Sequence, residues 1–277
     1  AIESQSRGHI ALLPADGSEL PCIVGQSLAF AIDPCLAPDG SYAAWQTWDE
    51  KQMPWDQSEL RVARFARPLS QCQSVHECFP LTLTTISRPQ THIAFALASS
   101  DANELIYASD ESGWRIPWIE NLRTQQRRPL TKIEAEVGTP NWVQRMMPMG
   151  LGANGTKLYA ISKREGESKL LSIDLTTGES KEIPTAFRCL DSLAVFDGRG
   201  QNDDQLAYLG SSPQVAPLLV TRSISPNGTA SSERARLNTA VGIWAENRHA
   251  PCTKLTFKAS DGTEISGVFT RSAEASN

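Results

Sequence analysis

A hairpin pattern that returns several times along the chain is the strongest constraint on its fold. In residues 169–175 apolar side chains alternate with polar ones, residues 176–179 form a turn motif around Gly178, and residues 181–183 resume the alternation. Alternation with a period of two is typical of a half-buried strand, and a glycine-bearing turn between two such runs indicates a hairpin. A chain built from these hairpins must bury one sheet face against another sheet.

The hairpins belong to a longer repeating unit. Related hairpins cover residues 9–23, 114–131 and 218–228. Further strand pairs accompany them, with turn motifs at residues 38–40, 100–103, 153–155 and 197–200 and second strands over residues 42–48, 105–109, 158–162 and 206–209. Four short strands per unit are typical of a β-propeller blade. The spacing from Asn154 to Gly198 fits a blade repeat of roughly 40 to 50 residues.

The predicted fold class is therefore all-β. We expect a partial β-propeller of about four to five four-stranded blades over residues 1–250. One repeat is too long, and we interpret residues 66–88 as a long loop within it. Helical periodicity is nearly absent along the chain.

A boundary is predicted near Pro251, where the repeat register ends. Residues 255–259 and 264–270 have strand patterns on either side of a turn motif at residues 260–263. Residues 251–277 are accordingly predicted to hold a linker and a separate β-hairpin.

The charge balance disfavours two classes of partner. The chain has 26 Lys and Arg against 31 Asp and Glu, a net charge of -5, so no strongly basic face is expected for nucleic acid or an anionic membrane. No apolar run approaches the ~20 residues that would cross a bilayer. We expect neither nucleic acid nor a membrane as a partner. Because the chain starts at Ala1 rather than at a methionine, we interpret it as an internal segment.

The cysteines are scattered and form no Cys-x-x-Cys pair. They are Cys22, Cys35, Cys72, Cys78, Cys189 and Cys252. This distribution favours reduced, mostly buried thiols in a cytoplasmic protein over a disulfide framework. The Asn-Gly-Thr sequences at Asn154 and Asn227 fit a glycan acceptor in a secreted protein or a tight hairpin turn, and we prefer the turn.

A series of short motifs resembles a known family in its order and spacing. The motifs are Pro38-Asp39-Gly40, Trp45, Trp48, Met53-Pro54-Trp55-Asp56, Ser58-Glu59-Leu60, Ser109-Asp110-Glu111-Ser112-Gly113-Trp114, Leu130-Thr131, the run from Glu134 to Val143, and Leu255-Thr256-Phe257 with Ser260-Asp261-Gly262. Together they resemble serine peptidases of the prolyl oligopeptidase type, in the dipeptidyl- and acylaminoacyl-peptidase branch. The resemblance spans residues 8–270.

The resemblance implies that the chain is the second half of a propeller domain followed by the first hairpin of an α/β-hydrolase domain that is absent here. In such enzymes the propeller caps the active site, admits short or unfolded peptides and contributes substrate contacts. The implied partners are a peptide substrate and the protein's own hydrolase domain. No cofactor is expected.

The catalytic groups of such a peptidase are missing from this sequence. No Gly-x-Ser-x-Gly occurs, so the chain lacks the turn that exposes a nucleophilic serine. We therefore name no catalytic residue and interpret the chain as a segment of a serine-type exopeptidase that gates and positions peptides. One alternative is a non-catalytic propeller scaffold. Another is a propeller glycosidase, which would require paired carboxylates facing one pocket.

Two groups of residues that look like sites have simpler interpretations. Trp45, Trp48, Trp55, Trp114, Trp118 and Trp142 are predicted to pack between sheets rather than to stack on a ligand. Cys72, His76 and Cys78 can ligate a metal, but zinc requires four ligands and no fourth is adjacent in the sequence. No metal site is therefore predicted. Ser58 and Ser112 have no activating neighbour, and we assign them to turns.

Glu134 and Glu136 are the candidate substrate-binding residues. In the dipeptidyl-peptidase branch, the resemblance implies, propeller carboxylates hold the free ammonium group of the peptide. Two carboxylates one residue apart suit that cation through charge-assisted hydrogen bonds. The simpler interpretation is an exposed acidic turn.

Overall fold

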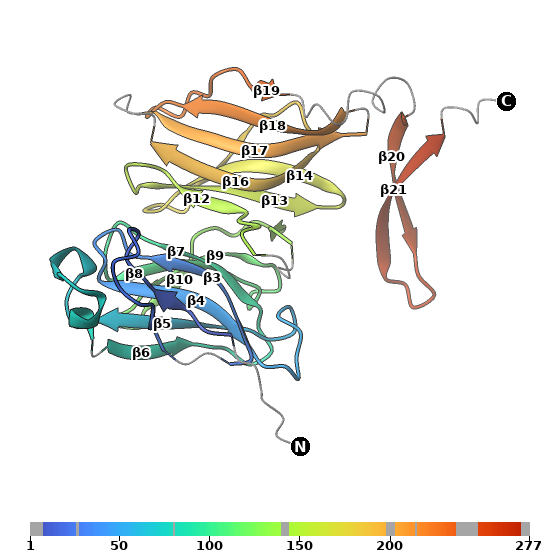
Figure 1. The fold of residues 1–277 in the computed structure, drawn as a ribbon. Coiled ribbons are helices and arrows are strands. Elements are labelled where there is room, and N and C mark those ends of the chain that lie inside the picture. The colour runs from blue at the N-terminus through green and yellow to red at the C-terminus, as the bar shows by residue number, and fades with distance from the viewer. Residues whose placement is uncertain are drawn as a thin grey trace. The chain divides into compact units, whose positions relative to one another are not determined.

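A computed structural model describes residues 8–25, 28–79, 81–139, 144–197, 203–213, 215–236 and 249–272. The described chain is almost entirely β-structure (Figure 1) and divides into two compact units. Unit 1 comprises residues 1–134 and 139–145, and unit 2 comprises residues 135–138 and 146–277. Two features of the sequence prediction, Trp142 and the turn at residues 198–200, lie outside the described residues.

The described part of unit 1 contains two four-stranded antiparallel sheets, each formed by strands consecutive in the chain. The first consists of β3 (Phe30–Leu36), β4 (Tyr42–Trp48), β5 (Glu59–Phe65) and β6 (Leu81–Ile86), and the second of β7 (Ile93–Ala98), β8 (Glu104–Ser109), β9 (Ile116–Asn121) and β10 (Arg127–Pro129). A short two-stranded sheet of β1 (Ala11–Leu12) and β2 (Cys22–Ile23) precedes them. Two 3₁₀ helices, η1 (Leu69–Gln71) and η2 (Val75–Cys78), lie between β5 and β6.

Unit 2 repeats this arrangement in its described residues. Its first sheet consists of β11 (Glu136–Val137), β12 (Met149–Leu151), β13 (Lys157–Arg164), β14 (Glu167–Asp174) and β15 (Ser180–Ile183). Its second consists of β16 (Cys189–Asp197), β17 (Asp204–Ser212), β18 (Val215–Ile224) and β19 (Arg234–Arg236). A separate hairpin of β20 (His249–Lys258) and β21 (Glu264–Ser272) follows.

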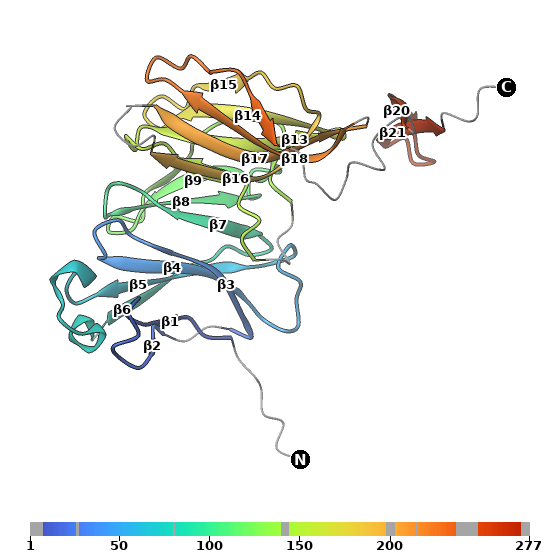
Figure 2. The same cartoon turned by 45° about the horizontal axis from the view of Figure 1, so that its top comes forward.

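Within each unit the two sheets bury a shared apolar layer. In unit 1, Leu60 and Val62 of β5 pack in one cluster with Ile93 of β7 and Leu105 of β8, and Figure 2 shows the two sheets face to face. In unit 2, Ile161 of β13 belongs to a cluster with residues of β16, β17 and β18. Full burial of one such side chain contributes about 1.5–3 kcal/mol, so these layers are the main source of stability in each unit.

The four tyrosines of the chain occupy the second strand of each sheet and are fully buried. Two of them link neighbouring sheets. Tyr42 Oη donates to the carbonyl oxygen of Glu104 at 2.7 Å, and Tyr159 Oη donates to Asp204 Oδ2 at 2.7 Å. Glu104 and Asp204 are each the first residue of the second strand in the following sheet. Both units therefore use the same polar connection between sheets.

Three first strands share a β-bulge whose backbone is in the left-handed region. The register of β3, β7 and β16 shifts at a point occupied by Asp33 (φ 49°), Phe95 (φ 57°) and Ser192 (φ 53°). A residue other than glycine pays about 1–3 kcal/mol for such a conformation. Packing of the surrounding sheet offsets this cost, and the repetition marks the bulge as a feature of the repeating unit.

The remaining first strand is interrupted rather than bulged. Val137 of β11 lies opposite Ser162 of β13, and Met149 of β12 lies opposite Ala160. Next to these strands, the N–H of Gly138 donates to the carbonyl oxygen of Ile161, and the N–H of Ile161 donates to the carbonyl oxygen of Pro148. The first strand is thus formed in two stretches, and the first of them ends at Val137, one residue after Glu136.

The predicted all-β fold with four-stranded units and a separate hairpin is confirmed. The strand expected at residues 42–48 coincides with β4, and the hairpin expected after Pro251 is formed by β20 and β21. The interpretation of residues 66–88 as a loop was wrong in part, because β6 completes the first sheet by pairing with β5. The apolar positions of β6 alternate with threonines, a strand pattern that the preceding segment rich in Ser, Pro and Cys obscured. Among the described residues, no helix is long and apolar enough to cross a membrane.

Candidate functional site

The candidate carboxylates lie at the start of the interrupted strand. Glu136 is the first residue of β11, is half-buried, and lies opposite Lys163 of β13. Glu134 precedes the strand and is exposed. Both residues take part in an interaction within the folded chain. Glu134 thus lies two residues before β11, and Glu136 is the first residue of that strand.

Arg145, which follows the glutamates in the sequence, is hydrogen-bonded to β3 within unit 1. The backbone N–H of Arg145 donates to Asp33 Oδ1 at 2.7 Å. Asp33 is the bulge residue of β3 and is 8 % exposed, and its Oδ2 is buried without a hydrogen-bond partner in the described structure. Sequence reasoning did not single out Asp33, because neither its bulge nor its contact with Arg145 is visible in a local pattern.

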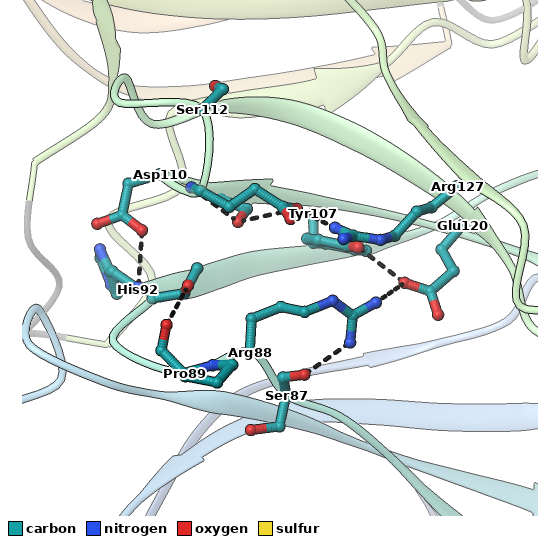
Figure 3. A network of polar contacts seen from close by, with 12 residues as sticks. Ser87, Arg88, Pro89, His92, Tyr107, Asp110, Ser112, Glu120 and Arg127 are labelled. Atoms are coloured by element: carbon teal, nitrogen blue, oxygen red, sulfur yellow. Dashed lines mark hydrogen bonds and ion pairs between the residues drawn. The ribbon is translucent and has the colours of Figure 1, made fainter.

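A polar network crosses the second sheet of unit 1 (Figure 3). Tyr107 Oη donates to Glu120 Oε2 at 2.8 Å, and Arg88 Nη2 lies 3.6 Å from the same oxygen. Arg127 forms an ion pair with Glu111 and lies over the ring of Trp118 at 5.1 Å from its centroid. Burial, and then the charge of Glu120, raise the pKa of Tyr107. Each charge has an opposite charge beside it, so the network holds strands together and offers no free nucleophile.

His92 is engaged in the same region and does not present a free base at Nδ1. It is fully buried, and its Nδ1 lies 3.0 Å from Arg115 Nη1. Because a guanidinium group only donates hydrogen bonds, Nδ1 accepts and carries no proton. The backbone N–H of His92 also donates to Asp110 Oδ1 at 2.9 Å, as Figure 3 shows.

The two serines of the motifs have different surroundings. Ser58 is 1 % exposed, and its Oγ donates to the carbonyl oxygen of Ile93 at 2.9 Å and accepts from the N–H of Ile93 at 3.0 Å. The assignment of Ser58 to a turn was wrong, since it stands immediately before β5 and connects the two sheets of unit 1. Ser112 is exposed and lies in a turn, as predicted, with Oγ donating to the carbonyl oxygen of Trp114 at 3.2 Å.

The tryptophans follow the packing prediction only in part. Trp45 and Trp48 are buried in unit 1, and the ring of Trp48 stacks on Phe30 with centroids 5.0 Å apart. Trp55, Trp114 and Trp118 are half-buried. Core packing therefore accounts for the first two.

The fold brings Cys22 beside His76, one of the three residues considered as metal ligands. Cys22 of β2 has its Sγ 3.2 Å from His76 Nδ1, although the two residues are 54 positions apart in the sequence. All six cysteines are free thiols. Among the described residues, no group of three or more His, Cys, Asp or Glu side chains could hold a metal ion.

Comparison with known proteins gives a structural likeness. No protein-family model and no curated protein matches the chain. A puromycin hydrolase complexed with PGG is 24% identical with a TM-score of 0.74, and the match covers 95% of this chain and 38% of that one. A puromycin-hydrolyzing peptidase of Mycobacterium tuberculosis is 19% identical with a TM-score of 0.73, covering 94% and 38%.

A more distant likeness extends to a prolyl oligopeptidase itself. Prolyl oligopeptidase B of Galerina marginata, solved with a 25-residue macrocyclization substrate, is 11% identical with a TM-score of 0.57, covering 86% of this chain and 30% of that one. The chain thus spans well under half the length of these structures. Its four-stranded sheets are those of a propeller, and the chain has the fold of the propeller domain of prolyl oligopeptidase-type peptidases.

Proposed function

We propose that this chain is the propeller segment of a serine peptidase of the prolyl oligopeptidase type and that the whole protein hydrolyses short peptides. The observation that carries the proposal is the match of 95% of the chain to 38% of a puromycin hydrolase at a TM-score of 0.74. The motif series from Pro38 to Gly262 runs in the order of that family. This sequence has no Gly-x-Ser-x-Gly, the motif that carries the nucleophilic serine. Catalysis therefore belongs to an α/β-hydrolase domain outside this sequence.

Within the proposed enzyme the propeller gates and positions the substrate. The domains that we propose are residues 1–250 and 251–277, and this boundary assigns β21 and all but the first two residues of β20 to the start of the hydrolase domain. The partners are then a peptide and that domain, and the compartment we propose is the cytoplasm. No cofactor enters this proposal, because a serine, a histidine and an aspartate suffice for acyl transfer.

Glu134 and Glu136 are proposed to bind the ammonium group of the substrate. Their support is the position of Glu136 at the start of β11, one residue before that short strand ends. Side chains near a strand end or in a connecting segment often bind ligands. Cleavage would then occur at a fixed distance from the amino terminus, which makes the enzyme an exopeptidase.

A fluorophosphonate probe for serine hydrolases tests the proposal. The 277-residue chain should stay unlabelled, and the protein extended past Asn277 through its next domain should be labelled at one serine within a Gly-x-Ser-x-Gly. An extension without that motif and without labelling would favour a non-catalytic propeller scaffold. Labelling of the 277-residue chain at a defined serine would contradict the assignment of catalysis to a separate domain.

A further inference from the structure

One sheet edge in unit 1 lacks the features that keep strand edges from pairing with other strands. β6 is the last strand of the first sheet, and no described strand pairs with its far side (Figure 1). An open edge presents its backbone N–H and carbonyl groups to any strand of matching length. Proteins protect such edges with charged residues, proline, β-bulges or very short strands.

The last strands of the other large sheets carry that protection. β10 has three residues, two arginines and a proline. β15 has four residues with a lysine and a glutamate at its centre, and β19 is a three-residue strand with the sequence Arg-Ala-Arg. Each of these strands is shorter than β6 and places charge along its edge.

The opposite edges of the four large sheets are protected by irregular backbone. β3, β7 and β16 each contain a β-bulge, and the corresponding strand of the remaining sheet is divided into β11 and β12. A bulge bends the strand and interrupts its row of hydrogen-bonding groups. Among the described edges of these four sheets, β6 is thus the one without charge, proline, bulge or shortness.

β6 is instead regular and uncharged. Its six residues are Leu-Thr-Leu-Thr-Thr-Ile, and all six are paired with β5 without a shift of register. Thr82, Thr84 and Thr85 are exposed, and β-branched side chains such as these favour the extended conformation. The far side of β6 therefore offers a straight edge of six residues for strand addition.

We propose that β6 is a self-association edge, on which the β6 strand of a second copy of this chain pairs antiparallel about a two-fold axis. An interface between identical chains of this kind requires a surface that complements itself, and two identical antiparallel strands meet that requirement. No charged side chain of β6 faces its counterpart, whereas the same pairing of β10 or β19 brings arginines together. Six residues per copy make a small interface, so we expect a reversible dimer.

Sedimentation velocity of the 277-residue chain over a range of concentrations tests this proposal. The wild type should show a reversible equilibrium between monomer and dimer. Thr84→Lys places a positive charge near the two-fold axis in each copy, and like charges on facing strands disfavour pairing. The dissociation constant of the dimer should rise by about ten-fold or more, which is a loss of about 1.4 kcal/mol.

Two control variants separate the edge from other causes of association. Thr84→Val keeps an uncharged β-branched side chain and should dimerise like the wild type. Thr124→Lys adds the same charge to an exposed turn of unit 1 between β9 and β10, and it should also dimerise like the wild type. Circular dichroism should show that Thr84→Lys is folded, because Thr84 is exposed. If that variant does not fold, Thr82→Lys tests the same edge from a second exposed position.

Hydrogen exchange with mass spectrometry locates the contact. In the wild type the N–H groups of β6 should exchange more slowly at high protein concentration, and in Thr84→Lys this dependence should disappear. A wild-type chain that stays monomeric at every concentration overturns the proposal. So does a folded lysine variant of β6 that dimerises as tightly as the wild type, or an equal loss of the dimer in Thr124→Lys. Exchange in β6 that does not depend on concentration, in a chain that does dimerise, also overturns it by placing the contact on another surface.

Discussion

Ser58 Oγ both donates to and accepts from the backbone of Ile93, at 2.9 and 3.0 Å, so one hydroxyl group satisfies the first residue of β7 from the neighbouring sheet. The backbone N–H of Ser58 also donates to the carbonyl oxygen of Thr91 at 3.1 Å. These three hydrogen bonds connect the residue before β5 to the start of β7 and to the segment before it, where the two sheets of unit 1 meet.

Replacing Ser58 by alanine should destabilise unit 1 by about 1–3 kcal/mol, because a buried N–H and a buried carbonyl group lose their partner. Urea unfolding followed by tryptophan fluorescence measures this change, since Trp45, Trp48, Trp55, Trp114 and Trp118 all belong to unit 1. Ser112→Ala is the matched control, because the Ser112 side chain is exposed and its loss should change stability by less than about 0.5 kcal/mol. Equal effects of the two substitutions would refute the role assigned to Ser58.

Gly152→Ala should loosen the corresponding connection in unit 2. A Cβ at this position would lie 2.6 Å from Asp204 Oδ2, the oxygen that accepts from Tyr159 Oη. Either the carboxylate or the backbone must move, and overpacking of this kind costs about 1–3 kcal/mol. Hydrogen exchange with mass spectrometry should show faster exchange in β13 and β17.

Gly267→Ala is the control for that experiment. A Cβ added at Gly267 meets no atom within 4 Å, so exchange in β13 and β17 should stay at the wild-type rate. A Gly152→Ala protein with unchanged exchange would mean that Asp204 relaxes without cost and that the Tyr159 contact contributes little.

Alkaline pH should destabilise the protein through its buried tyrosines. Burial, and then the hydrogen bond with Glu233, raise the pKa of Tyr208 to about 12, against about 10 for an exposed tyrosine. Between these values the unfolded chain has lost a proton that the folded chain retains, so stability falls as pH rises. Below about pH 10 the contribution of Tyr208 to the stability of the folded state is fully present.

Midpoints of urea unfolding measured from pH 8 to pH 11 test whether stability falls as the pH rises. The Tyr208→Phe substitution should make the free energy of unfolding fall less steeply at alkaline pH, by up to about 1.4 kcal/mol per pH unit for one titrating group. The remaining decline belongs to the other buried tyrosines, whose pKa values burial also raises. A Tyr208→Phe protein with the wild-type slope would show that Tyr208 ionises as freely in the folded state as in the unfolded state.

The parts of the fold that sequence predicted are those encoded locally. Turns such as Asn154-Gly155 and Asn227-Gly228 require a residue at positive φ, and Gly155 and Gly228 adopt it at 63° and 86°. The alternation of apolar and polar residues on both sides of such turns predicted the repeating unit. The bulge at Phe95 was not predictable in this way, because its backbone conformation is imposed by the paired strand β8 and not by its own side chain.

Contacts between distant residues account for what the sequence did not reveal. Ser58 and Ile93 are 35 positions apart, and Cys22 and His76 are 54 apart. Neither partner has a local signature, so each pair became visible only once sheet packing had been established.

The remaining prediction concerns Glu134 and Glu136 in the longer protein that includes the hydrolase domain. If either carboxylate binds the substrate ammonium group, its replacement by glutamine should remove a charge-assisted hydrogen bond worth about 1.5–3 kcal/mol. The value of kcat/KM should then fall by roughly ten- to a hundred-fold, since each ~1.4 kcal/mol is a factor of ten. Steady-state kinetics on a peptide with a free amino terminus measures the loss.

The N-acylated form of the same peptide distinguishes recognition of the amine from support of the fold. It carries no cation, so Glu134→Gln and Glu136→Gln should leave its kcat/KM almost unchanged. Equal losses on both peptides would mean that the carboxylate stabilises the strand start, a role available to Glu136 because it begins β11 opposite Lys163. No loss on either peptide would identify the pair as a solvated acidic segment. Since Glu134 is exposed and Glu136 half-buried, a loss confined to free amines should differ in size between the two variants, and the larger loss assigns the residue closer to the ammonium group.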